Sequence, residues 1–351
     1  MYQYRAYVKD VLNLDDKPKC FLTVISFTIR RDLLTNATSD FTVLNASQNI
    51  DNGDVFCLYN PNGKVIYQGV INQIEENNIQ CIQMSSLLKG QFVYNTAPQA
   101  SLEKEVEMLL SYYVKAWYDE FERDNLFSNK FRSFAFESKG TTNLHLPTKE
   151  PKTVIDMEAF IYDLYAKYGL MVNFVINYQG QNKIIVETPK MSAHKVANNN
   201  NSIRNMLPIT EVAETNKLVV YNSKSEFRGA YYVTQDGITT NANDPLRKKV
   251  INEKILFSDD DLNTLVASTL PKQLYNHKLE FDLLLKSNIY KWDDWKLGQP
   301  LDIHMNDKYF KSIYTGYELV KTENSEPIMV HIICGMVRTS LTKKLLLRGV
   351  I

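Results

Sequence analysis

The five histidines are the residues of this sequence best suited to acid–base or metal chemistry, and they lie far apart in the chain. They are His145, His194, His277, His304 and His331. None forms a His-Glu-x-x-His motif or another spacing that would bring two ligands to one metal ion. His304 and His331 alternate with apolar residues as they would in strands, so we interpret both as structural residues at or just below the surface.

Motifs of nucleophilic and phosphate chemistry are missing from the sequence. It contains no Gly-x-Ser-x-Gly elbow, no Walker A motif and no Gly-x-Gly-x-x-Gly. No pair of carboxylates stands out as the acid and base of a glycosidase or peptidase, so hydrolysis of cell wall is only a rival hypothesis. The run 259–261 is three aspartates and could bind Mg²⁺, but it follows Ser258 where a helix is expected, and carboxylates there offset the helix dipole. We therefore predict no catalytic residue, no cofactor and no metal.

Two tryptophans could bind a sugar. Trp292 and Trp295 flank a pair of aspartates, and together with Tyr231 and Tyr232 they could stack on sugar rings. The alternative for the tryptophans is a turn in which one ring packs on the end of a barrel. Carbohydrate binding is thus the alternative function that the aromatic residues support.

The segment 341–351 is both basic and apolar. Its cations could contact phosphates or a membrane surface. Because three leucines lie beside them, docking on a neighbouring subunit or partner is the interpretation we favour. The residues concerned are Lys343, Lys344, Leu345, Leu346, Leu347 and Arg348.

Composition indicates a globular protein without a global attraction to nucleic acid. Among 351 residues, Lys+Arg and Asp+Glu are both 40, and the net charge is zero. The length suits about two to three domains. The four cysteines are scattered in strand-like apolar runs, so we expect reduced core thiols and synthesis in a cytoplasm. No stretch reaches the ~18 apolar residues that span a bilayer, and the start of the chain lacks the apolar core of a signal peptide.

Two hairpin patterns organise the chain. The first covers residues 53–71, where Asn60-Pro61-Asn62-Gly63 is a turn between two strands. The second covers residues 297–319. Both run through a Gly, a strand, a polar turn and a strand with Tyr-x-Gly, and a Gly inside a strand indicates a bulge or a close backbone approach. Two related small β-barrels are therefore expected, one near each end of the chain.

In the middle of the chain the spacing of apolar residues changes from the alternation of strands to the three- and four-residue steps of helices. Residues 100–123 repeat apolar residues at helical spacing, a second helix begins near Val154 and ends at Gly169, and residues 170–187 read as a hairpin. Another helix is expected after Ser258, capped by that serine and ended by Pro271.

The predicted fold class is mainly β with an α+β insertion: two related small β-barrel domains flank an α/β domain. The predicted boundaries are 1–97 for the first barrel, 98–202 for the insertion, 203–340 for the second barrel with a helix, and 341–351 for the tail.

Several of these runs together resemble the baseplate hub family of long-tailed bacteriophages, the tail-associated proteins of siphophages. The resemblance covers nearly the whole chain as an arrangement, and its motifs are short and structural. The runs that carry it are 34–44 (LTNATSDFTVL), 50–55 (IDNGDV), 63–71 (GKVIYQGVI), 294–303 (DWKLGQPLDI) and 313–318 (IYTGYE).

The resemblance implies a structural virion protein rather than an enzyme. Three protomers would close into a homotrimer whose pseudo-sixfold face continues the tail tube, with a threefold fibre or spike on the other end and a central channel. The implied partners are distal tail or tail-tube ring proteins, the tape-measure protein, a tail fibre or receptor-binding protein, and phage DNA in transit. Many tail-associated proteins continue into a fibre or a cell-wall-cleaving domain. This sequence stops at Ile351, so such an activity is expected on another protein of the tail tip.

Overall fold

The computed structural model forms two compact units. Unit 1 consists of residues 1–190 and 317–330, and unit 2 consists of residues 191–316 and 331–351. The three-domain division expected from the sequence stays a prediction. The residues that the structure describes are 3–45, 49–94, 99–120, 133–146, 153–197, 201–206, 210–211, 215–234, 237–247, 253–270, 275–287, 289–305 and 308–336.

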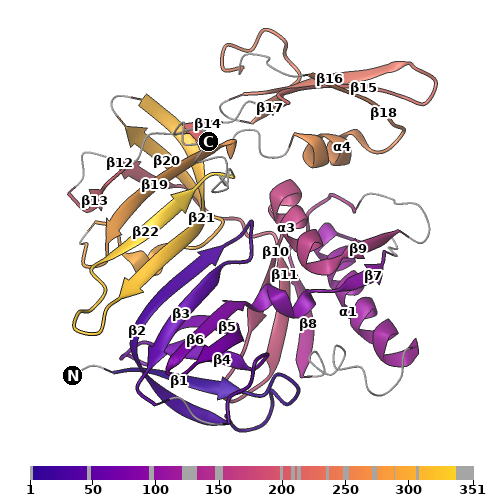
Figure 1. Ribbon diagram of the computed structural model, residues 1–351. Coiled ribbons are helices and arrows are strands. Elements are labelled where there is room, and N and C mark those ends of the chain that lie inside the picture. The colour runs from indigo at the N-terminus through magenta and orange to yellow at the C-terminus, as the bar shows by residue number, and fades with distance from the viewer. Residues whose placement is uncertain are drawn as a thin grey trace, which may run out of the picture. The chain divides into compact units, whose positions relative to one another are not determined.

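A closed six-stranded β-barrel forms the first part of unit 1 (Figure 1). Around the barrel the strand order is β1, β4, β5, β6, β3 and β2, and β2 pairs back onto β1 to close the ring. Because closure leaves no free edge inside the ring, the barrel is protected from edge-to-edge association. The strands are β1 (Tyr4–Lys9), β2 (Cys20–Asp32), β3 (Thr38–Val43), β4 (Val55–Tyr59), β5 (Val65–Glu75) and β6 (Asn78–Gln83).

Aromatic side chains fill this barrel. The ring of Phe41 on β3 lies 4.6 Å from that of Phe56 on β4 and 5.0 Å from that of Tyr67 on β5, between ring centroids. Phe27 on β2 joins the same cluster, and all four rings are buried. The alternation of apolar and polar residues along each strand directs these side chains inward, as a half-buried strand requires.

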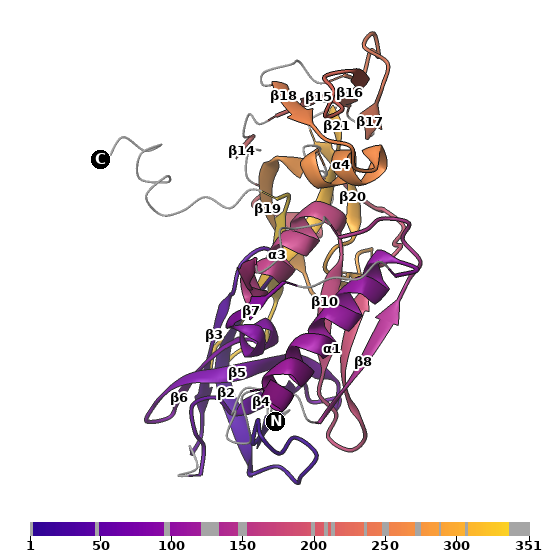
Figure 2. The same cartoon turned by 90° about the vertical axis from the view of Figure 1, so that its right-hand side faces the viewer.

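The second part of unit 1 joins helices to a small sheet. Strand β11 pairs with β10 antiparallel and with β8 parallel, and α1 and α3 pack against this sheet (Figure 2). In the first half of α1, the apolar side chains of Leu102, Val106, Leu109 and Leu110 are buried, as their spacing predicts. The elements are η1 (Met84–Leu88), β7 (Gln91–Val93), α1 (Leu102–Glu120), β8 (Phe134–Lys139), β9 (Val154–Asp156), α3 (Met157–Tyr168), β10 (Met171–Val175) and β11 (Asn182–Glu187).

Helix α3 begins and ends at local signals. Asp156 accepts a hydrogen bond from the Ala159 N–H, and Gly169 adopts the left-handed conformation with φ 71° at the other end. The prediction that Val154 belongs to this helix is wrong. Val154 pairs with Val93 in the strand pair β7–β9, because the chain is still extended before the Asp156 cap.

The sheet strands of unit 2 are arranged around the expected second hairpin. Strands β20 and β21 pair antiparallel, and β21 is followed by β22 and β19 in the sheet. Strand β12 pairs with β20 and β13 pairs with β19, so residues 194–197 and residues 203–204 border two different strands of the sheet. The elements are β12 (His194–Ala197), β13 (Ile203–Arg204), β14 (Thr210–Glu211), β19 (His277–Leu284), η3 (Trp292–Asp294), β20 (Pro300–Met305), β21 (Lys308–Lys321) and β22 (Met329–Cys334), the last two of which continue into unit 1.

A four-stranded sheet with one helix completes unit 2. Its order is β17-β16-β15-β18, and α4 covers one face (Figure 1). The predicted Ser258 cap is wrong: Asp261 accepts the Thr264 N–H at 2.8 Å, because the Ser258 N–H is still bonded to the Tyr221 carbonyl at the end of β18. The elements are β15 (Lys217–Tyr221), β16 (Phe227–Val233), β17 (Ile238–Thr239), β18 (Glu253–Phe257) and α4 (Leu262–Thr269).

The predicted fold class, mainly β with an α+β insertion, is confirmed by this architecture. In the part of the chain that the structure describes, no helix is long and apolar enough to cross a membrane.

Candidate functional site

The sequence predicted two groups of site residues, a basic and apolar segment near residue 351 and a pair of tryptophans. The basic and apolar segment with Lys343, Lys344, Leu345, Leu346, Leu347 and Arg348 lies outside the described residues. Its role as a contact stays a prediction.

The two tryptophans do not form one exposed platform. Trp295 is 7% exposed, and its ring stacks on His194 with centroids 5.4 Å apart and planes 18° apart. The ring of Tyr314 meets it edge-on at 5.8 Å. Trp292 is half-buried, and its ring also meets Tyr314 edge-on. Trp295 is thus part of the core of unit 2, and sugar stacking at Trp292 stays a prediction.

A second aromatic group in unit 2 was not identified from the sequence. A hollow of about 470 Å³ lies over β12, β20 and β21. In it the ring of His304 stacks on that of Tyr309, with centroids 4.2 Å apart and planes 12° apart, and Tyr309 is 75% exposed. Tyr290 reaches the same hollow from a loop and accepts the Ala197 N–H. Register between β20 and β21 places His304 opposite Tyr309, which sequence spacing alone does not show.

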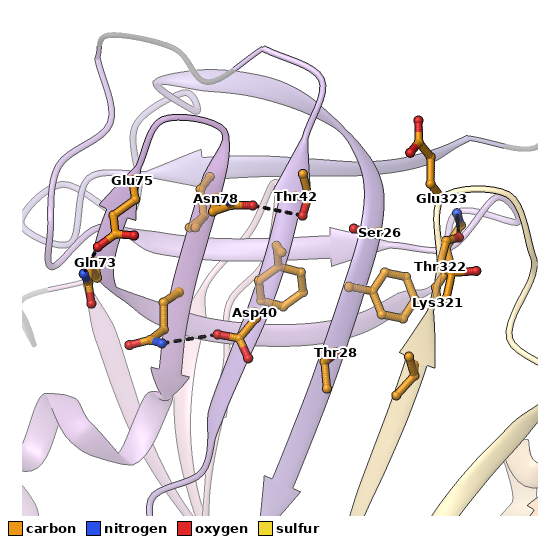
Figure 3. A pocket seen from close by; sticks show the side chains of 15 residues that line it. Ser26, Thr28, Asp40, Thr42, Gln73, Glu75, Asn78, Lys321, Thr322 and Glu323 are labelled. Atoms are coloured by element: carbon orange, nitrogen blue, oxygen red, sulfur yellow. Dashed lines mark hydrogen bonds between the residues drawn. The ribbon is translucent and has the colours of Figure 1, made fainter.

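A hollow of about 510 Å³ lies in unit 1, and both polar and apolar side chains line it (Figure 3). Strands β2, β3, β5 and β6 and the end of β21 line it. It carries the carboxylates of Asp40, Glu75 and Glu323. Two bulges border it, one between Val24 and Ser26 and one between Ile71 and Gln73. Bulges re-aim side chains and bend strands, which opens the hollow at this end of the barrel.

The one lysine that lines this hollow is directed to the backbone. Lys321 is 7% exposed, and its Nζ donates to the carbonyl oxygens of Ile25 at 2.7 Å and Thr322 at 3.0 Å. The first of these carbonyls belongs to the bulge in β2. The Lys321 ammonium therefore stabilises the irregular backbone of the bulge. Carboxylates, hydroxyls and amides line the hollow together with aromatic and aliphatic side chains.

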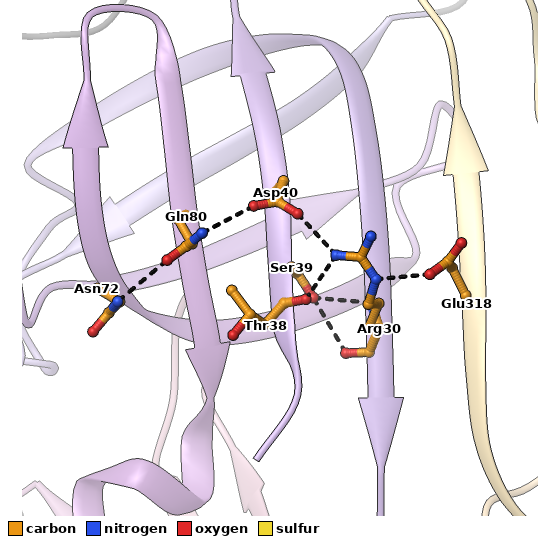
Figure 4. A network of polar contacts seen from close by, with 7 residues as sticks. All are labelled: Arg30, Thr38, Ser39, Asp40, Asn72, Gln80 and Glu318. Carbon is orange, nitrogen blue, oxygen red and sulfur yellow. Dashed lines mark hydrogen bonds and ion pairs between the residues drawn. The ribbon is translucent and has the colours of Figure 1, made fainter. Parts of the chain in front are cut away.

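A row of paired polar side chains crosses five strands of unit 1 (Figure 4). Asn72 donates to Gln80 at 3.3 Å, and Gln80 donates to Asp40 at 3.2 Å. Arg30 donates to Asp40 at 2.8 Å through Nη1 and to Glu318 at 2.7 Å through Nε. Each side chain is partly exposed or exposed. The row makes a polar surface whose side chains are held by one another.

The first hairpin begins with a turn that is closed by four hydrogen bonds. The Asp51 N–H donates to Asp54 Oδ2 at 2.9 Å, and the Asp54 N–H donates to the Asp51 carbonyl at 3.2 Å. The Gly53 N–H donates to the Ile71 carbonyl at 2.7 Å, and the Ile71 N–H donates to the Asp54 carbonyl at 2.8 Å. Gly53 has φ 96°, which favours glycine. We call this arrangement, Asp51–Asp54 with Ile71, the entry turn.

The second hairpin begins with the same arrangement. The Lys296 N–H donates to Gln299 Oε1 at 3.1 Å, and the Gln299 N–H donates to the Lys296 carbonyl at 3.0 Å. The Gly298 N–H donates to the Tyr314 carbonyl at 2.7 Å, and the Tyr314 N–H donates to the Gln299 carbonyl at 2.9 Å. Gly298 has φ 83°. The two entry turns therefore match bond for bond, although Asp in one stands where Gln stands in the other.

The matched turns correct the sequence alignment of the two hairpins. The entry turns align Ile71 with Tyr314, so the two Tyr-x-Gly motifs fall at different places in the strands. Gly69 lies opposite Phe56, inside the hairpin, whereas Gly316 lies two residues beyond Tyr314. A close backbone approach is confirmed at Gly69, where a Cβ would lie 2.6 Å from the Ile82 carbonyl oxygen. The Tyr-x-Gly similarity is therefore not a structural equivalence.

Replacing Asp54 by alanine should destabilise unit 1. The Asp54 carboxylate is buried, accepts the Asp51 N–H and pairs with the Lys19 ammonium at 2.8 Å. Losing these partners should cost about 1–3 kcal/mol in the free energy of unfolding. The matched variant in unit 2 is Gln299→Ala, which should also be destabilising. Urea unfolding of both variants measures the effect, and an unchanged midpoint for Asp54→Ala would contradict it.

A cluster of charged side chains on β19 and β22 makes the stability of unit 2 depend on pH. His331 Nδ1 lies 2.8 Å from Asp282 Oδ1, and its Nε2 lies 3.7 Å from Glu280 Oε1. Glu280 also pairs with Lys278 at 2.5 Å. The nearby carboxylate of Glu280, followed by the hydrogen-bonded carboxylate of Asp282, raises the pKa of His331 despite burial. Burial alone would raise the pKa of Glu280, but the neighbouring His331 and Lys278 lower it to about 2.

The stabilisation from His331 should fade as the solution becomes alkaline. Its pKa is higher in the folded state, so its contribution is complete below the unfolded pKa of about 6.5 and is lost as the pH rises through the folded pKa. We expect the difference in unfolding free energy between the natural protein and His331→Gln to be larger at pH 6 than at pH 9. Urea titrations at both pH values measure it. A difference of equal size at the two values would show that His331 acts through packing alone.

Comparison with solved structures shows which known proteins share this fold. No protein-family model matches the chain, and no curated protein matches its sequence. The structure is similar to the tail protein from Neisseria meningitidis MC58, with a TM-score of 0.54, 11% identity, and 95% of this chain and 96% of that chain covered. It is also similar to prophage tail protein gp18 from Listeria monocytogenes EGD-e, with a TM-score of 0.54, 13% identity and 99% of both chains covered. The chain has the fold of phage tail proteins.

The phage tail fold extends over the whole chain. Since the matches cover 95% and 99% of it, both units belong to the fold, including the two entry turns and the sheet with α4. Within the described ranges, no group of three or more His, Cys, Asp and Glu side chains could hold a metal ion. The candidate functional features of the described residues are the polar row and the hollow of unit 1, and the aromatic hollow of unit 2.

Proposed function

We propose that the protein is a structural subunit of a phage tail tip, a hub in which three copies close one end of the tail tube. The observation that carries the proposal is the bond-for-bond match of the two entry turns, one in each unit of a chain with the phage tail fold. A repeated hairpin within one chain is what a subunit needs if it presents two similar edges to its surroundings.

The repeat explains how a threefold object could meet a sixfold one. Three copies would present six entry turns, and six similar edges can contact a ring of six identical subunits. The partners of such a hub are a distal tail or tail-tube ring, the tape-measure protein, and a tail fibre or receptor-binding protein. DNA would pass through its central channel. The protein would then be made in the host cytoplasm and act in the virion.

The polar row of unit 1 supports an assembly role rather than an enzymatic one. Its charged groups are occupied by one another: the Arg30 guanidinium bonds to both Asp40 and Glu318. A catalytic acid or base would instead be oriented toward a place for substrate. We therefore propose that the protein is not an enzyme.

The native mass of the purified protein tests the proposal. A hub of three copies has three times the 40.6 kDa mass of the chain. Mass photometry should detect this species alone or after co-expression with a tail-tube ring protein of the same phage. A monomer under both conditions would overturn the proposal, because the ring partner would then fail to assemble the hub.

The aromatic hollow of unit 2 favours a second candidate function, carbohydrate binding. Stacked rings with an exposed face, such as Tyr309 on His304, are suited to sugar rings, and Lys195, Asp302 and Lys311 supply polar groups beside them. A glycan array screened with the natural protein and with Tyr309→Ala separates this candidate from the hub. Binding that is lost in the variant would favour a receptor-recognition module, and so would binding that is lost in Trp292→Ala.

A further inference from the structure

The sheet of β15, β16 and β18 in unit 2 has one face covered by α4, and its other face is exposed at one end, where β15 and β18 finish and β16 begins. Helix α4 packs on the side that carries Leu218 and Val220. On the other face of the sheet, Tyr221 of β15 is paired with Phe227 of β16 and with Phe257 of β18. Phe227 is 64% exposed and Phe257 is 63% exposed. We call the group of Tyr221, Phe227, Phe257 and Ile255 the aromatic face; Ile255 is 53% exposed.

The aromatic face is ordered before anything binds to it. The ring of Tyr221 stacks on that of Phe257 with centroids 5.5 Å apart and planes 24° apart. It meets the ring of Phe227 edge-on at 5.9 Å. Aromatic side chains held by their neighbours lose little conformational freedom on binding, and contiguous exposed apolar groups mark interaction sites. This arrangement is suited to a protein segment with apolar side chains.

The rim next to the aromatic face is acidic. Glu226, Asp259 and Asp260 are exposed where β15, β16 and β18 end. Asp259 accepts the Ser223 N–H at 3.2 Å. The Ser223 side chain first, and this N–H second, lower the pKa of the Asp259 carboxyl. Arg228 is engaged with the carbonyl oxygens of Ser258 and Asp260 at 2.7 Å, which leaves Lys224 as the other cation of the hairpin tip. The rim therefore attracts a basic segment.

One segment of this chain combines the required properties. Residues 342–351 (TKKLLLRGVI) contain three cationic side chains, five aliphatic side chains and no Asp or Glu. Such a segment complements an apolar surface with an acidic rim. The described chain before it ends in unit 2, where the Met336 N–H donates to the Tyr275 carbonyl at 2.8 Å.

We propose that the aromatic face of one copy binds residues 342–351 of a neighbouring copy. Leu345, Leu346 and Leu347 would pack on the rings, with Lys343 and Lys344 near the carboxylates of the rim. The contact is head-to-tail, and three such contacts close a ring. This proposal rests on the proposed hub and names the contact that holds its copies together.

Photo-crosslinking of the full chain tests the contact. Two versions are co-expressed: one carries a photo-reactive phenylalanine analogue at position 257, and the other carries Val350→Leu, which changes the mass of its last peptide. We expect the analogue to capture the marked peptide, which can come only from a neighbouring copy. Capture of the unmarked peptide alone, of another segment, or of nothing would overturn the proposal. The matched control places the analogue at Phe21 of unit 1, which is 65% exposed and should not capture residues 342–351.

Charge reversal provides a second test that does not depend on the photochemistry. Asp259→Lys with Asp260→Lys should weaken association of the copies by about tenfold, and Lys343→Glu with Lys344→Glu should do the same. All four substitutions together should restore association. An additive loss in the fourfold variant would overturn the contact. If the natural protein forms no trimer either alone or with a ring protein, the proposed hub fails; if it forms a trimer without the crosslink or the rescue, only this contact fails.

Discussion

Gly335→Ala should destabilise unit 2 by about 3–5 kcal/mol, near the upper end of single substitutions. Gly335 directly follows β22 with φ 84°, and an added Cβ would overlap the carbonyl oxygen of His277 on β19. Its own backbone is fixed, because its N–H donates to the Ile313 carbonyl and its carbonyl accepts the Thr315 hydroxyl at 2.7 Å. The clash can be relieved only by separating these strands.

Urea unfolding followed by tryptophan fluorescence measures this loss, since Trp295 is buried in unit 2. Gly53→Ala is the matched control, because Gly53 has φ 96° but no atom within 4 Å of an added Cβ. In Gly53→Ala the free energy of unfolding should fall only by the cost of a left-handed backbone at alanine, roughly 1–2 kcal/mol. If the free energy of unfolding fell equally in the two variants, the His277 carbonyl would not clash with a side chain at position 335.

Phe41→Ala should destabilise unit 1 by about 3–5 kcal/mol. Phe41 is 1% exposed at the centre of the barrel, where Phe27, Phe56 and Tyr67 surround it. Removing the ring loses its burial and leaves a cavity, which the closed barrel cannot collapse without breaking strand pairing. The free energy of unfolding from urea titrations, followed by circular dichroism, is the measurement.

Phe21→Ala is the control for this prediction, because it removes the same side chain from a site that is 65% exposed. Its effect should be within about 0.5 kcal/mol. Phe41→Leu should lie between the two, since leucine fills part of the space. A small loss in Phe41→Ala would mean that the barrel repacks around the gap.

Local signals account for the parts of the fold that were predicted correctly. The first hairpin is specified by its turn, where Asn60 Oδ1 accepts the N–H groups of Asn62 and Lys64 and Gly63 adopts φ 78°. Helix α3 is specified by a cap and a terminal glycine within 14 residues of one another. Where the local signal was ambiguous, prediction failed: Ser258 and Asp261 are both good caps, and only the pairing of β18 with β15 decides between them.

Long-range contacts account for what was missed. The polar row joins Arg30 to Glu318, which are separated by 288 residues, and no spacing in the sequence indicates that pairing. The entry turns were missed for a different reason. Their side-chain acceptors differ in type, Asp54 in one and Gln299 in the other, while the Tyr-x-Gly motifs coincide in letters but not in register.

By itself the sequence determined the mainly β fold class, both hairpins and the helices of the insertion, because turn chemistry, caps and apolar periodicity act over a few residues. Only the tertiary structure decided which residues share a surface: the closing of the barrel, the match of the entry turns, the burial of Trp295 and the exposure of the aromatic face. These depend on strand order and register, in which a shift of one residue turns every side chain to the opposite face.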